Sequence, residues 1–130
     1  MDRIFFAIGS LLAGLAVGAG AYGAHGEPAL DEDQVRWIAK SARYQMYHGF
    51  GLIFVSLAIS HWRERAALFY AAGWLFLSGI VLFSGSLYVM AFAGLDLGYM
   101  TPAGGIAFMA GWVLMAYAGL LKKEGKGPGL

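Results

Sequence analysis

Cysteine is absent from this sequence, and charged residues are scarce. The 130-residue chain contains no Cys, and only 13% of its residues are charged. Without Cys the protein cannot form disulfides, thiolate nucleophiles, or Cys-ligated zinc and iron–sulfur sites. The formal net charge of +1, together with the lack of a basic run that contains aromatics, argues against a nucleic-acid partner.

Hydrophobic residues and glycine are abundant instead. Hydrophobic residues make up 59% of the chain, and the mean hydropathy is +0.62. These values lie outside the range of soluble globular domains and indicate a membrane protein. The 20 glycines indicate close helix packing, because small residues let helix backbones approach one another within lipid.

Long uncharged runs predict an all-α fold with four membrane spans. A helix needs about 20 apolar residues to cross a hydrocarbon core of about 30 Å. We expect an antiparallel four-helix bundle within one domain, residues 1–121, followed by a basic, disordered tail at 122–130. The predicted spans are residues 4–24, 44–60, 68–91 and 102–121.

Capping signals predict two helix starts. Asp31, with Gln34 three residues later, resembles a capping box. Residues 31–43 are therefore predicted to form a short amphipathic helix in the membrane interface, the alternative being a solvated loop helix. Thr101 and Pro102 are predicted as the N-cap and first residue of the fourth span.

Small residues at intervals of four predict packing faces on two spans. The first stripe also argues against a cleaved signal peptide at Ala19-Gly20-Ala21, because a signal segment needs no such face. Either stripe could serve a homo-oligomer or a membrane-protein partner as well as contacts within one chain. The stripes are Ser10, Gly14 and Gly18 in the first span, and Ala103, Ala107, Gly111 and Gly119 in the fourth.

The basic residues predict the orientation in the membrane. Four spans place both termini on one side, and basic residues favour the cytoplasmic side. The side with the termini carries Arg3, Arg63, Arg65, Lys122, Lys123 and Lys126, whereas the other carries Arg36, Lys40 and Arg43. We therefore expect a multi-pass membrane protein with both termini in the cytoplasm.

Polar residues are predicted to gather in one leaflet. In an antiparallel arrangement, the end of span one, the start of span two, the end of span three and the start of span four meet on one side. Polar side chains at membrane depth are costly without partners, so they are candidate binding residues. They are His25, Tyr44, Gln45, His48, Ser84, Ser86, Tyr88 and Thr101.

Four motifs in these regions resemble a known family. They are Gly-Ala-His-Gly at 23–26, Tyr-Gln-Met-Tyr-His-Gly at 44–49, Phe-Ser-Gly-Ser-Leu-Tyr at 83–88, and Leu-Gly-Tyr-Met-Thr-Pro-Ala-Gly-Gly at 97–105. Together they are similar to the membrane family named domain of unknown function 423, whose eukaryotic relatives are called transmembrane protein 256. The resemblance implies a small four-span inner-membrane protein, and it implies no activity, substrate or cofactor.

The residues themselves favour binding over catalysis. No Ser–His–acid set, paired carboxylates or phosphate-binding Gly loop is evident, so no catalytic residue, metal or cofactor is predicted. We expect a non-enzymatic protein whose polar cluster binds a membrane lipid, a hydrophobic small molecule or a partner helix. Alternatives are purely structural use of the cluster, a small oligomeric transporter or channel subunit, and an intramembrane enzyme that uses His25 or His48.

Overall fold

The computed structural model describes residues 2–26 and 29–121, and within these ranges the chain is helical without any strand. This confirms the all-α prediction. The tail predicted to be disordered, residues 122–130, lies outside the described residues, as do residues 27–28. The elements are α1 (Asp2–Ala24), α2 (Glu32–His61), the 3₁₀ turn η1 (Arg63–Arg65), α3 (Ala66–Gly79), the π-helical segment η2 (Ile80–Ser84), α4 (Gly85–Ala93) and α5 (Met100–Leu120).

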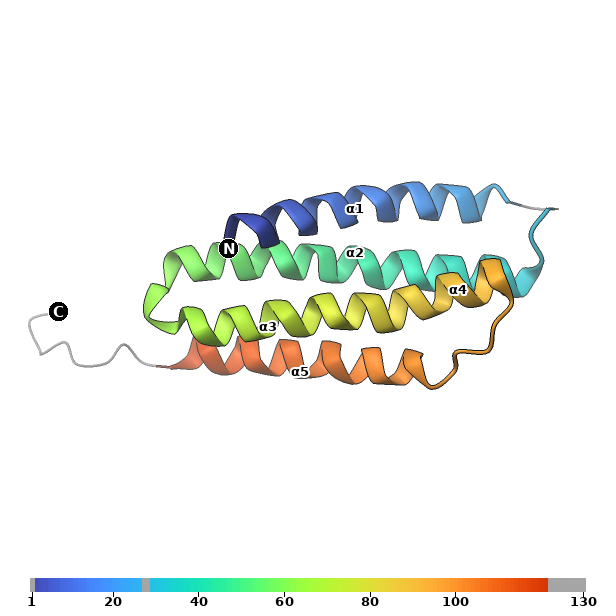
Figure 1. The fold of residues 1–130 in the computed structure, drawn as a ribbon. Coiled ribbons are helices and arrows are strands. Elements are labelled where there is room, and N and C mark those ends of the chain that lie inside the picture. Colours follow the sequence, from blue (N-terminus) through green and yellow to red (C-terminus); the bar gives the residue numbers. More distant parts are fainter. Residues whose placement is uncertain (1, 27–28, 122–130) are drawn as a thin grey trace, which may run out of the picture.

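The helical elements form long rods that lie side by side and alternate in direction (Figure 1). They are α1, α2, the continuous rod α3–η2–α4, and α5. Contacts join α1 mainly to α2, join α2 to the third rod, and join α5 to α3 and η2. Consequently α2 and the third rod are central, while the start of α1 and the end of α5 lie at the same end of the molecule (Figure 1).

The second rod is one unbroken helix, α2, from Glu32 to His61. The prediction of an interfacial helix at 31–43, separate from a span at 44–60, is therefore wrong. No Gly or Pro occurs between residues 32 and 48, so nothing in the sequence interrupts the helix at Arg43–Tyr44. Ala42 and Gln45, on either side of this point, are both buried, so tertiary packing continues across it.

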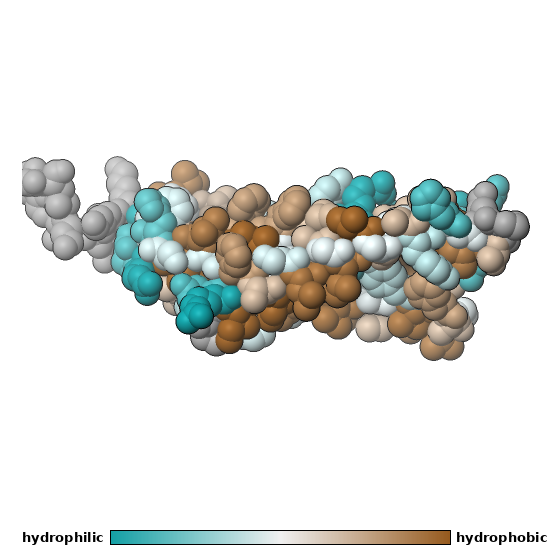
Figure 2. All heavy atoms as spheres, turned by 90° about the horizontal axis from the view of Figure 1, so that it is seen from above, coloured by the Kyte–Doolittle hydropathy of each residue, from teal (hydrophilic) through white to brown (hydrophobic). Residues whose placement is uncertain are grey.

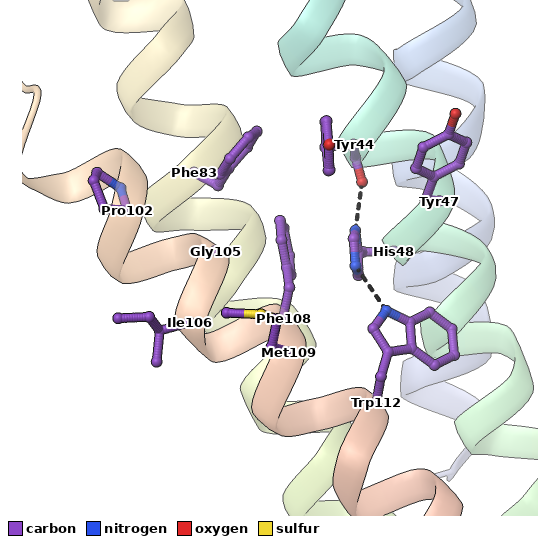
Figure 3. Close-up of a pocket in the computed structure, with 10 residues that line it drawn as sticks. All are labelled: Tyr44, Tyr47, His48, Phe83, Pro102, Gly105, Ile106, Phe108, Met109 and Trp112. Atoms are coloured by element: carbon purple, nitrogen blue, oxygen red, sulfur yellow. Dashed lines mark hydrogen bonds between the residues drawn. The ribbon is translucent and has the colours of Figure 1, made fainter.

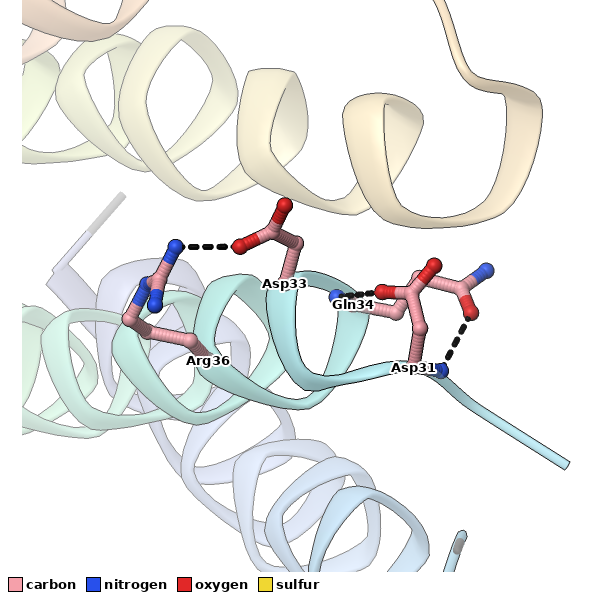
Figure 4. A network of polar contacts seen from close by, with 4 residues as sticks. All are labelled: Asp31, Asp33, Gln34 and Arg36. Atoms are coloured by element: carbon pink, nitrogen blue, oxygen red, sulfur yellow. Dashed lines mark hydrogen bonds and ion pairs between the residues drawn. The ribbon is translucent and has the colours of Figure 1, made fainter. Parts of the chain in front are cut away.

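The predicted start of this helix is confirmed. Asp31 Oδ1 accepts a hydrogen bond from the Gln34 backbone N–H at 2.8 Å, and the Asp31 N–H donates to Gln34 Oε1 at 2.9 Å. This reciprocal pair is a capping box (Figure 4). It satisfies backbone groups that would otherwise lack partners at the first turn.

The third rod covers the predicted span at 68–91 but contains an irregularity that the sequence did not predict. Between α3 and α4 the helix widens into η2 over Ile80–Ser84. The rod ends at Gly94, whose φ of 71° lies in the left-handed region that favours glycine. Residues 94–99 then form a non-helical connection to the next helix.

The start of α5 differs from the prediction. The helix begins at Met100, with Tyr99 at the cap position and no side-chain cap. Thr101 therefore does not cap the helix, and Pro102 is its third residue. The Thr101 hydroxyl instead contacts Ser86 of α4 at 2.6 Å, so a tertiary contact has replaced the predicted local one.

The first small-residue stripe faces away from the other helices. A Cβ added at Gly14 or Gly18 would meet nothing within 4 Å. The buried small residues of α1 are Gly9, Ala16 and Gly23. At Gly9 a Cβ would lie 2.5 Å from the Gly49 carbonyl oxygen, so α1 and α2 approach closely there.

The stripe predicted on the fourth span likewise contributes little to packing within the chain. Of its four residues only Gly111 is buried, whereas Gly119 has open space around it. The buried face of α5 is formed by Gly104, Phe108, Gly111 and Ala118.

Among the residues that the structure describes, three helical stretches are long and apolar enough to cross a membrane, namely Asp2–Ala24, Arg63–Ala93 and Met100–Leu120. Hydrophobic side chains cover the middle of the molecule, and hydrophilic ones gather mostly toward its ends (Figure 2). The chain therefore fits a multi-pass membrane protein. By composition α2 is not among the candidate spans, because its first half carries charged residues and then the Tyr44–His48 segment.

Candidate functional site

One face of α2 carries polar side chains that bond to every other rod. Gln34, Ser41, Gln45 and His48 are three, four or seven residues apart, which places them on one side of a helix. Gln34 Nε2 donates to the Ala91 carbonyl of α4 at 2.9 Å. The other three make the contacts described next.

Gln45 joins three rods. It is 5% exposed. Its Nε2 donates to the Leu12 carbonyl of α1 at 2.8 Å, and its Oε1 accepts from the Tyr88 hydroxyl of α4 at 2.8 Å. Leu12 is near the midpoint of α1, so this polar group lies deep along the helices rather than at their ends.

Two serine contacts connect the π-helical segment and its neighbours. Ser41 Oγ donates to the Ser84 carbonyl at 2.8 Å, and Ser84 Oγ donates to the Ser41 carbonyl at 3.0 Å. Ser86 Oγ donates to the Phe83 carbonyl at 2.8 Å, so the 2.6 Å contact with Thr101 leaves the threonine hydroxyl as donor. These bonds join η2 to α2 and α4 to α5.

His48 connects α2 to α5. Its Nδ1 is 2.7 Å from the Tyr44 carbonyl oxygen, and its Nε2 is 3.0 Å from Trp112 Nε1. A carbonyl can only accept and an indole N–H can only donate, so both bonds require a neutral His48 with its proton on Nδ1. The imidazole also stacks on Phe108 with ring centroids 3.5 Å apart.

These contacts use the polar atoms of the cluster internally. Within the described ranges no buried side-chain nitrogen or oxygen lacks a hydrogen-bond partner. Seven of the eight predicted site residues belong to this network or its immediate surroundings, namely Tyr44, Gln45, His48, Ser84, Ser86, Tyr88 and Thr101. Such bonds are the contacts that hold helices together in lipid.

The structure does not bring His25 to the cluster. His25 is exposed just beyond the end of α1. His48 is next to Gly49, which packs against Gly9 and Ala13. At a rise of 1.5 Å per residue, the 12 positions from Ala13 to His25 correspond to roughly 18 Å along α1.

Sequence reasoning missed Ser41 and Trp112. Ser41 precedes Gln45 and His48 by four and seven residues, so helical spacing alone could have placed it on the same face. Trp112 gave no comparable signal, because a tryptophan within an apolar run is usually a packing or lipid-facing residue. Only the juxtaposition of α2 and α5 reveals its partner.

A groove of about 740 Å³ adjoins the network between α2 and α5 (Figure 3). Of the predicted site residues, only Tyr44 and His48 line it. Aromatic rings dominate its walls, and Tyr44 packs on Phe83 with ring centroids 4.6 Å apart. The lining residues are Tyr44, Tyr47 and His48 of α2, Phe83 of η2, and Pro102, Gly105, Ile106, Phe108, Met109 and Trp112 of α5.

A family model described as "Protein of unknown function (DUF423)" matches residues 19–105, the part of the chain that includes all four motifs and the bond between Gln45 and Tyr88. The chain belongs to this family. The predicted resemblance is thereby confirmed. All the groove residues except Ile106, Phe108, Met109 and Trp112 also lie in the part that the DUF423 model matches.

Curated relatives of this DUF423 protein are membrane proteins. A UPF0382 membrane protein of Staphylococcus epidermidis is 42% identical over 91% of this chain and 96% of its own length. The UPF0382 membrane protein YwdK of Bacillus subtilis is 38% identical over 89% and 95%. The UPF0382 inner membrane protein YgdD of Escherichia coli is 35% identical over 96% and 97%. No solved structure matches the chain significantly.

Proposed function

We propose that α2 is a fourth membrane crossing although its composition is the least apolar. The helix runs antiparallel alongside α1, and glycines 9 and 49 let the two backbones meet. If α1 crosses the bilayer, α2 must cross with it, because the polar face of α2 is covered by the neighbouring rods. Four crossings leave both termini and the loop after α2 on one side. This side carries Arg3, Arg63 and Arg65, so we assign it to the cytoplasm.

Reporter fusions test this topology. Alkaline phosphatase fused to the C-terminus should be inactive, and the same enzyme fused within the 94–99 turn should be active. Activity at the C-terminus would overturn the orientation. Termini found on opposite sides of the membrane would overturn the four crossings.

We propose further that the protein is a non-enzymatic membrane protein that binds a lipid or another hydrophobic molecule in the groove between α2 and α5. The observation that carries this proposal is the groove itself, with its size and its aromatic walls (Figure 3). Sites of this kind are mostly apolar, with a few polar groups that fix orientation. The hydroxyls of Tyr44 and Tyr47, which make no hydrogen bond to any described residue, supply such groups.

Filling the groove provides the test. A Cβ at Gly105 would lie 4.0 Å from the Phe83 ring, so Gly105→Phe fits the backbone and places its ring in the groove. Gly119→Phe is the matched control, because it makes the same change on α5 where nothing lies within 4 Å. The wild type and the control should retain a small hydrophobic molecule in native mass spectrometry, whereas Gly105→Phe should lose it.

The comparison contradicts the proposal if Gly105→Phe retains the same molecule as the control. Thermal melting of both variants tests whether each remains folded. The oligomeric transporter and partner-helix hypotheses stay predictions. The same mass spectra bear on the first, because a closed ring of subunits would favour transport.

A further inference from the structure

Two basic side chains lie one helical turn from the groove tyrosines. Lys40 precedes Tyr44 by four residues, and Arg43 precedes Tyr47 by four residues, so each pair shares a face of α2. In Figure 3 the Tyr47 hydroxyl points toward the N-terminal half of α2, which is the half that carries both basic residues. Helical spacing therefore places two basic residues beyond one end of the groove lining.

These two charges are available to a ligand. Lys40 and Arg43 are both exposed, and no ion pair or hydrogen bond joins either side chain to the part of the chain that the structure describes. Arg36 differs, because its guanidinium pairs with Asp33 one turn earlier (Figure 4). The acidic residues described at this end are Asp31, Glu32 and Asp33, which precede Lys40 by at least seven positions, and Asp96, which lies in the 94–99 turn.

Long side chains can carry both charges toward the headgroups of the nearer leaflet. Gln45 is level with the middle of α1, so the backbone at Lys40 and Arg43, five and two positions earlier, lies within the hydrocarbon. Helical side chains lean toward the N-terminus, and Lys and Arg extend their charged ends toward water. A molecule with its apolar part in the groove could thus bring a headgroup within reach of both charged ends.

We infer that the occupant of the groove is an anionic phospholipid whose phosphate is bound by Lys40 and Arg43 while an acyl chain lies against the aromatic walls. The inference rests on the proposed groove function and adds the chemistry of the ligand. Charge complementarity carries it, since a neutral hydrophobic molecule would leave both basic side chains unused. A zwitterionic phospholipid carries its own cationic group to the same surface, so its electrostatic attraction to Lys40 and Arg43 is weaker.

Lipid competition tests the headgroup assignment. The wild type is supplied in detergent with equal amounts of phosphatidylglycerol and phosphatidylcholine that have identical acyl chains, and the retained lipids are quantified by native mass spectrometry. A basic residue near a headgroup contributes about a fivefold preference for anionic lipid. Lys40→Gln with Arg43→Gln should therefore reduce the preference by up to about 25-fold.

A matched control removes the same charge elsewhere. Arg3→Gln with Arg63→Gln changes two exposed basic residues at the other end of the molecule and should leave the preference as in the wild type. Equal loss in both double variants would mean that overall charge sets the preference, and this would overturn the inference.

Failure of the inference and failure of the proposed function are distinguishable. If the wild type retains both lipids equally and Gly105→Phe releases both, the headgroup assignment is wrong and the groove function stands. If the wild type retains neither lipid, both fail. A preference that Gly105→Phe leaves intact would place the anionic lipid outside the groove and overturn the inference.

Discussion

Gln45 should be a principal stabilising residue of the helix assembly. Its amide makes one bond to α1 and one to α4, at 2.8 Å each, in a position that is 5% exposed. Hydrogen bonds between membrane helices contribute about 0.6 kcal/mol on average and about 1.7 kcal/mol at most. Gln45→Leu should therefore lower the free energy of unfolding by about 1 to 3 kcal/mol.

A double-mutant cycle with Tyr88 sharpens this prediction. Tyr88→Phe removes the bond between the hydroxyl and Gln45 Oε1, so it should cost at least about 0.6 kcal/mol alone. In Gln45→Leu the Tyr88 hydroxyl has already lost its bond to Gln45. Adding Tyr88→Phe should then cost about 0.6 kcal/mol less than it does in the wild type, because that bond is no longer there to remove.

Unfolding in mixed micelles with a titrated denaturing detergent measures the four proteins of the cycle. The expected coupling between the two residues is about 0.6 kcal/mol. Strictly additive effects, or a Gln45→Leu protein as stable as the wild type, would refute the reasoning that this network holds the rods together.

Two further predictions concern the third rod. A Cβ at Gly104 would lie 2.4 Å from a backbone nitrogen of η2, so Gly104→Ala should destabilise the protein by about 1 to 3 kcal/mol in thermal melts. Gly14→Ala, where nothing is within 4 Å, should be neutral or stabilise by up to about 1 kcal/mol, and equal effects would contradict the packing argument. Ser41→Ala removes one of the two bonds to Ser84, so the amides of η2 should exchange hydrogen about threefold faster; unchanged exchange would show that the serine pair does not hold the π-helical segment.

The local and topological features could be predicted from the sequence. The capping box at Asp31 depends on residues three positions apart, and spacing alone indicated it. Alternating rods brought Ser86 to Thr101 and Gln45 to Tyr88, as the antiparallel order of the motifs predicted. Neither inference required knowledge of which face of a helix touches which neighbour.

The packing contacts that were not predicted depend on which face of each helix touches its neighbour. A spacing of four places Ser10, Gly14 and Gly18 on one side of α1, but the contact runs through Gly9, Ala16 and Gly23. Both sets are small and periodic, so sequence alone does not choose between them. The π-helical segment likewise packs against α2 and α5, contacts that the sequence alone does not reveal.

The low hydropathy of α2 follows from its role at the centre of the assembly. Ser41, Gln45 and His48 each bond a different neighbour, and the same side chains make α2 too polar to qualify as a span by composition. Replacing all three by Leu would make α2 more apolar, so glycosylation mapping should show that it inserts at least as well as the wild type. The variant should nevertheless lose cooperative thermal unfolding, because lipid is as apolar as leucine and provides no preference for helix contact over acyl chains. A variant that melted like the wild type would mean that close glycine packing, rather than the polar face of α2, assembles the rods.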